Sequence, residues 1–155
     1  MNIRMLKSTT AVGAVTALII AAGALSWDTS ARAQAAPGHC SDQTLNGSYA
    51  FEIDGQILSG PFAGVLRGVA MTQFDGHGHL DQVDFATLNG IPRWTGWRSV
   101  TGTYQVNADC TGEAVLNPSD GSPSLHLFLV VANHGQDIKT VVAGNATGSR
   151  GTRVN

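Results

Sequence analysis

The sequence predicts an all-β protein, and three observations support this fold class. After residue 36, apolar and polar side chains alternate with a period of two, and helical periodicity is almost absent. Turn-forming pairs such as Asp75-Gly76 and Asn89-Gly90 separate the alternating segments. The 155 residues include 19 glycines and only 13% charged residues, a composition typical of tightly turned β proteins. We therefore expect about eight antiparallel strands joined by short turns.

The first 35 residues have the features of a cleaved secretory signal. Arg4 and Lys7 precede an apolar run over residues 11–25, and Ala33-Gln34-Ala35 fits the small-x-small cleavage rule. The apolar run is shorter than the roughly 20 residues that a spanning helix needs, which argues against the alternative of a membrane anchor. We expect cleavage after Ala35, with a cut after Ala33 as the alternative. The mature protein is then secreted or periplasmic and has no membrane span.

Cys40 and Cys110 are the two cysteines of the chain. In an exported protein, two cysteines pair with each other by default. A disulfide here ties an N-terminal leader, residues 36–46, to a barrel domain over residues 47–155. A reactive redox thiol is the alternative, but that chemistry favours a Cys-x-x-Cys pair.

The first predicted strand covers residues 48–54 and alternates cleanly, because Tyr49, Phe51 and Ile53 fall on one face. The next two strands form a hairpin around the turn at residues 75–78, where glycine supplies a positive φ without steric cost. These two strands cover residues 63–74 and 79–88.

The second half of the chain continues the same pattern. Residues 89–92 predict a turn, and a long strand over residues 94–106 follows, bent at Gly96 or Gly102. Four further strands complete the set of eight, namely residues 111–116, 125–132, 138–143 and 146–153. Consecutive hairpins without a long crossover favour an up-and-down barrel. A β-sandwich is the alternative. An eight-stranded barrel is just wide enough to be filled by side chains or to hold one small ligand.

Three stretches of the sequence resemble a group of small exported bacterial proteins of uncharacterised function. The stretches are Cys40-x4-Leu45-Asn46-Gly47-Ser48-Tyr49-x-Phe51, Phe74-Asp75-Gly76-x-Gly78, and Thr101-Gly102-Thr103-Tyr104-x-Val106-Asn107-x-Asp109-Cys110-Thr111-Gly112. The resemblance covers most of the mature chain. It implies a β-barrel-like fold and a disulfide, and it carries no known active site.

A second resemblance is to barrels of the lipocalin and avidin type. Those folds open with Gly-x-Trp on the first strand, covered by a basic residue from the last strand. Gly47-Ser48-Tyr49 occupies the matching place, with Tyr49 instead of tryptophan, and Arg150 or Arg153 is the candidate for the basic partner. The usual biotin-binding pattern is not evident, so this resemblance implies an architecture and not a function.

Two tryptophans close together are the main candidates for ligand binding. Trp94 and Trp97 lie between Arg93 and Arg98, and either arginine could face an acidic group of a ligand. Residues three apart on a regular strand face opposite sides, so we expect at most one indole to reach a barrel interior. The alternative is one core and one surface tryptophan. Tyr49 and Phe128 are the other aromatic candidates for a pocket.

Histidines supply two further hypotheses. If His126 faces the interior, it could transfer protons together with Glu52 or Asp84. His77 and His79 are spaced to project to one side of a strand, as a zinc site requires, but no third ligand is defined. A polar hairpin tip is the simpler interpretation of the second pair.

These observations favour a binding function. The net charge of −2 and the absence of a basic patch argue against nucleic acid as a partner. No nucleophile elbow, phosphate loop or His-Glu-x-x-His motif is present, and no cofactor is predicted. We expect an exported module that holds a small apolar ligand in a barrel or docks another envelope protein. The alternatives are a barrel-type isomerase or cyclase using His126, and an envelope protease inhibitor whose N-terminal segment, residues 36–45, enters a protease cleft.

Overall fold

The computed structural model describes residues 39–154, and the predicted signal segment with its cleavage site lies outside this range. The strands are β1 (Asn46–Ile57), β2 (Gly64–Asp75), β3 (His79–Leu88), β4 (Ile91–Pro92), β5 (Arg98–Val106), β6 (Thr111–Pro118), β7 (Leu125–Ala132), β8 (Asp137–Val142) and β9 (Ala146–Arg153). Two short 3-10 helices are η1 (Asp42–Thr44) and η2 (Asn133–Gly135). Within residues 39–154, no helix is long and apolar enough to cross a membrane.

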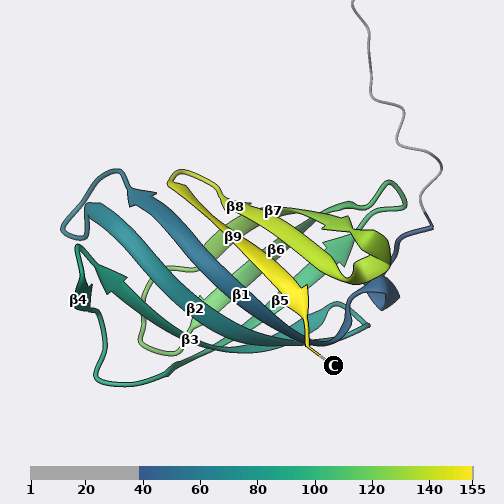
Figure 1. Ribbon diagram of the computed structural model, residues 1–155, viewed down its shortest axis with the longest axis horizontal. Coiled ribbons are helices and arrows are strands. Elements are labelled where there is room, and N and C mark those ends of the chain that lie inside the picture. The colour runs from purple at the N-terminus through teal and green to yellow at the C-terminus, as the bar shows by residue number, and fades with distance from the viewer. Residues whose placement is uncertain (1–38, 155) are drawn as a thin grey trace, which may run out of the picture. The chain divides into compact units, whose positions relative to one another are not determined.

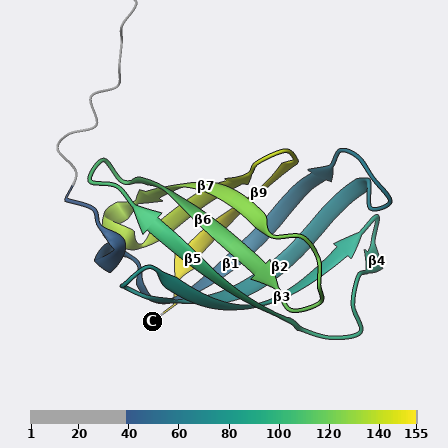
Figure 2. The same cartoon turned by 180° about the vertical axis from the view of Figure 1, so that it is seen from behind.

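The strands form a closed antiparallel barrel, which confirms the predicted fold class and excludes the sandwich. Neighbours follow the order β2-β1-β9-β8-β7-β6-β5-β3, and pairing of β2 with β3 closes the ring of eight (Figure 1). The short β4 is an additional strand that pairs with β3 alone. Seen from behind, β5, β6 and β7 cross the opposite wall (Figure 2).

Strand boundaries agree closely with the sequence pattern except around the tryptophans. β3, β7 and β9 begin and end where the alternation predicts. The long strand expected over residues 94–106 instead begins at Arg98, and the preceding residues form a series of bends. Part of the turn expected at residues 89–92 is β4, in which Pro92 is tolerated because β4 lies at an edge.

The two ends of the barrel differ. At the closed end lie η1, η2, the C-terminal end of β9 and the β2–β3 and β5–β6 turns (right side of Figure 1). At the open end lie the longer connections, which are residues 58–63, 89–97 and 119–124, together with the β8–β9 turn.

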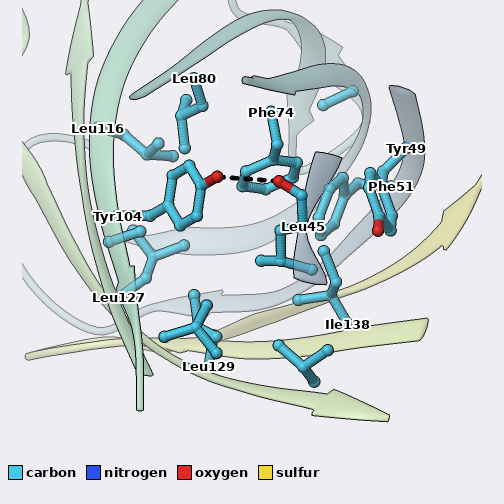
Figure 3. Packing of buried hydrophobic residues seen from close by; sticks show 14 of the residues in the cluster. Leu45, Tyr49, Phe51, Phe74, Leu80, Tyr104, Leu116, Leu127, Leu129 and Ile138 are labelled. Carbon is cyan, nitrogen blue, oxygen red and sulfur yellow. Dashed lines mark hydrogen bonds between the residues drawn. The ribbon is translucent and has the colours of Figure 1, made fainter. Parts of the chain in front are cut away.

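An aromatic cluster fills the closed end. The Phe74 ring packs edge-to-face between Tyr49 and Tyr104, with centroid distances of 5.3 and 5.0 Å (Figure 3). Leu45 is fully buried beside them, and its carbonyl accepts a 2.9 Å hydrogen bond from the Tyr104 hydroxyl. Burial raises the pKa of both tyrosines.

Arg153 is the basic residue that covers Tyr49. Its guanidinium carbon lies 5.1 Å from the Tyr49 ring centroid, and Nη2 donates a 2.7 Å hydrogen bond to the tyrosine hydroxyl. The Tyr49 hydroxyl in turn donates to the carbonyl of Gly135 in η2. Arg150, the other candidate, lies on the outer face, 3.8 Å from an Asp54 carboxylate oxygen.

The predicted disulfide between Cys40 and Cys110 is confirmed, and it holds the segment before β1 across the closed end. It joins that segment to the β5–β6 turn over a separation of 70 residues. The Asp42 carboxylate adds a second link, because it accepts a 2.7 Å hydrogen bond from the Val106 amide.

Gly151 on β9 permits the close approach of the Phe51 ring inside the barrel. A Cβ atom at residue 151 would overlap with the ring carbons of Phe51, which is itself buried. We expect Gly151→Ala to lower the free energy of unfolding by about 1–3 kcal/mol, because the ring must leave its packed position. Urea unfolding followed by circular dichroism measures this loss. Gly96→Ala is the control, since residue 96 has open space around it, and an equal effect of both variants would contradict the explanation.

Candidate ligand-binding site

The open half of the barrel contains a cavity of about 420 Å³. This volume lies within the range of roughly 300–1,000 Å³ that small-molecule sites usually have. Small inward-facing residues, among them Ala86 and Ala114, leave the space unfilled. The aromatic and aliphatic side chains of Phe74, Leu129 and Ile138 separate the cavity from the closed end and form its floor.

Two opposite walls of the cavity are apolar. Phe51, Ile53 and Ile57 line it from β1. β6 lies across the barrel from β1 in the strand order, and it contributes Leu116 together with the leucines of the adjacent β7. Burial of apolar ligand surface between these walls is favourable by roughly 25 cal/mol per Å².

The wall formed by β2, β3 and β5 carries a connected polar chain. The Thr72 hydroxyl donates to the Gln82 side-chain carbonyl at 2.8 Å, and the Gln82 amide donates to an Asp84 oxygen at 3.2 Å. Arg98 Nε and Nη2 donate to the two Asp84 oxygens at 3.0 and 2.8 Å. The side chains of Asp84 and Arg98 are 6% and 11% exposed, so this is a bidentate ion pair largely shielded from water.

At the mouth of the cavity, Trp94 and Asp120 contact Arg98 and each other. The Trp94 ring centroid lies 4.0 Å from the Arg98 guanidinium carbon. Its indole N–H donates to an Asp120 oxygen at 2.8 Å, and Arg98 Nη1 lies 3.4 Å from the same oxygen. Partial burial acts to raise the pKa of Asp120, but hydrogen bonds from Ser122 and Trp94 and the Arg98 charge hold it well below its usual range.

Hydroxyl groups line the opposite wall, on β8 and β9. The hydroxyls of Thr140 and Ser149 lie 2.7 Å apart and share a hydrogen bond. Thr147 is 5% exposed, and among residues 39–154 its hydroxyl has no hydrogen-bond partner. Thr147 therefore offers a bound molecule its hydroxyl, and the Thr140–Ser149 pair keeps one O–H that is not used between the two residues.

The aromatic candidates from the sequence separate into inside and outside positions. Trp94 lines the cavity, whereas Trp97 is 63% exposed and packs against Phe85, with ring centroids 6.3 Å apart. Tyr49 lies in the closed-end cluster and does not line the cavity. Phe128 is corrected to the outer face, where it is 46% exposed, because its neighbours Leu127 and Leu129 face inward.

The hypothesis of an interior His126 is also corrected. Its ring Nε2 lies 2.8 Å from a Glu113 oxygen on the outer face of the barrel. Glu52 is exposed as well, whereas Asp84 faces the cavity. The structure therefore does not bring His126 and Asp84 together as an acid–base pair.

His77 lies in the β2–β3 turn, and His79 is the first residue of β3. The Asp75 carboxylate accepts hydrogen bonds from the two backbone amides, at 2.7 and 3.0 Å, and these bonds lower the pKa of Asp75. Across residues 39–154, no group of three or more histidine, cysteine, aspartate or glutamate side chains is placed to hold a metal ion.

Asp120 is a member of the site that the sequence did not indicate, since residues 117–123 read as a plain loop. An aspartate beside glycine and serine signals a turn, and its contact with Arg98 depends on tertiary structure.

Comparison of the chain with models of known protein families, with curated proteins and with solved structures found no match.

Proposed function

We propose that this protein is an exported binding module that holds a small, mainly apolar molecule in the open half of its barrel. The cavity of about 420 Å³ with two apolar walls is the observation that carries the proposal. The signal-like N-terminus and the Cys40–Cys110 disulfide support export, because disulfides persist in oxidising compartments.

The polar groups of the cavity favour an apolar ligand over a sugar or another highly polar molecule. Both oxygens of Asp84 already accept hydrogen bonds, and Thr72 and Gln82 bond to each other. A polar ligand would lose its hydrogen bonds to water and find few unused partners here, at a cost of about 1–3 kcal/mol for each unpaired group. An apolar ligand avoids this cost.

The same contacts favour binding over proton-transfer catalysis. Asp84 is the interior carboxylate named in the isomerase alternative, but the Arg98 guanidinium holds both of its oxygens. A general base must reach a substrate proton within hydrogen-bond distance, and this carboxylate is already occupied.

The protease-inhibitor alternative is also less well supported. It requires residues 36–45 to project from the domain. Of these, Cys40 is bonded to Cys110, and Leu45 is fully buried in the closed-end cluster. This part of the segment therefore packs on the barrel and is not extended for a protease cleft.

Binding of the uncharged fluorophore N-phenyl-1-naphthylamine tests the proposal. We expect its emission to rise on binding to the wild-type protein. Thr147→Phe places a phenyl ring in the cavity and should weaken binding by about tenfold or more, since 1.4 kcal/mol of lost contact is a factor of ten.

Ala146→Phe is the matched control, because residue 146 is the exposed neighbour of Thr147 on the same strand. It should bind the fluorophore like the wild type. Thermal unfolding of both variants verifies that they are folded. Absence of binding by the wild type, or equal weakening by the two folded variants, would contradict a cavity site.

A further inference from the structure

Arg93 lies at the mouth of the cavity, in the connection between β4 and β5. Its backbone amide donates a 3.0 Å hydrogen bond to the Ala86 carbonyl, which fixes the residue against β3. Its partly buried side chain lines the cavity. The guanidinium carbon lies 4.2 Å from the Phe62 ring centroid and 5.3 Å from that of Trp94. The two rings therefore position a cation beside the apolar interior.

Residues 39–154 contain four other arginines. Arg93 differs from them because its guanidinium has no polar partner among these residues. Arg67 and Arg150 pair with Asp54, and Arg98 pairs with Asp84 and Asp120. Arg153 donates to backbone carbonyls and to Tyr49. The side-chain N–H groups of Arg93 make neither an ion pair nor a hydrogen bond within the described part of the chain.

The nearby carboxylate does not neutralise Arg93. Asp120 lies at the same mouth, but it is engaged by the Trp94 indole, by Arg98 and by the Ser122 amide. Deeper in the cavity, the positive charge of Arg98 is committed to two carboxylates. An anionic group on a ligand would therefore meet an available cation at the mouth and not in the interior.

We propose that Arg93 binds the carboxylate of an amphipathic ligand whose apolar part occupies the cavity. This inference rests on the proposed binding function and adds the chemical class and the orientation of the ligand. A guanidinium forms paired hydrogen bonds with a carboxylate, and stacking on Phe62 and Trp94 leaves its N–H edge free to do so.

Competition between decanoic acid and decanol tests the proposal, because the two molecules share an alkyl chain and differ in charge. Each is titrated against bound N-phenyl-1-naphthylamine at neutral pH, and the ratio of the alcohol Kd to the acid Kd is recorded. We expect Arg93→Gln to lower this ratio about five- to tenfold, the effect of losing one partly desolvated charged hydrogen bond. Arg93→Lys should keep part of the ratio, since it keeps the charge without the paired geometry.

Arg67→Gln is the matched control, since it removes the same charge from the outer face, where the Arg67 side chain is 63% exposed. It should leave the ratio as in the wild type. Raising the salt concentration should weaken decanoate more than decanol in the wild type. An equal ratio in the wild type and Arg93→Gln, with both competitors bound, would overturn this inference alone. Failure of the fluorophore and decanol to bind would overturn the proposed function, and this inference with it.

Discussion

Replacing Cys40 and Cys110 together by serine should lower the free energy of unfolding by about 2–5 kcal/mol. The disulfide closes a loop with a sequence separation of 70 residues, so its loss gives the unfolded chain much more freedom. It also releases the segment that buries Leu45 and carries the Asp42 bond to Val106. Urea unfolding of the double variant, followed by tryptophan fluorescence, measures the loss.

Reduction of the wild-type protein provides a control that needs no substitution. Wild type unfolded in dithiothreitol should match the serine variant, because both lack the same cross-link. The cavity lies toward the other end of the barrel, so the folded variant should still bind the neutral fluorophore. A loss of stability below about 0.5 kcal/mol would mean that packing of Leu45 and Tyr104 holds the closed end without the disulfide.

The strand pattern could be predicted because alternation and turn residues agree along most of the chain. The first strand shows this, since Tyr49 and Phe51 are buried while Ala50 and Glu52 between them are exposed. Turns with glycine at positive φ, such as Gly76, mark the hairpins independently of the alternation. Where alternation and turn residues agree, the local sequence is sufficient to predict a strand and its ends.

The inner face of β7 could not be predicted from alternation. Both of its faces carry large apolar residues, because Leu127 and Leu129 face inward while Phe128 and Val130 are exposed. Whether His126 points inward or outward depends on which face of β7 is buried, and no local feature of the sequence determines that. The pairing of β7 with β6 and β8 fixes the inward set, and this is long-range information.

The cavity and the chain of polar side chains on its wall also could not be predicted from a local sequence pattern. Whether a barrel is hollow depends on the combined size of inward residues from all its strands, among them Ala86 and Ala114. The contact of Trp94 with Asp120 joins two loops that are 26 residues apart in the sequence. The sequence could identify Arg98 as a candidate site residue, because it lies beside the two tryptophans. It could not identify the carboxylates that pair with Arg98.

Asp84→Leu should lower the free energy of unfolding by about 3–5 kcal/mol, because it leaves the Arg98 charge largely buried without its bidentate partner. Asp120 keeps one contact with Arg98, at 3.4 Å, and this contact should hold the loss near the lower end of the range. Urea unfolding of the single variant and the wild type measures the difference.

The double variant Asp84→Leu with Arg98→Met distinguishes a cost of an unpaired charge from a cost of lost packing. With both charges removed, no ion is left desolvated, so we expect the double variant to recover most of the lost stability. Asp120 then retains the Trp94 indole and the Ser122 amide as donors. If the double variant is as unstable as Asp84→Leu alone, the loss of stability comes from the packing and hydrogen bonds of the two side chains and not from an unpaired charge. Recovery would instead mean that the pair contributes little net stability compared with two apolar side chains of similar size.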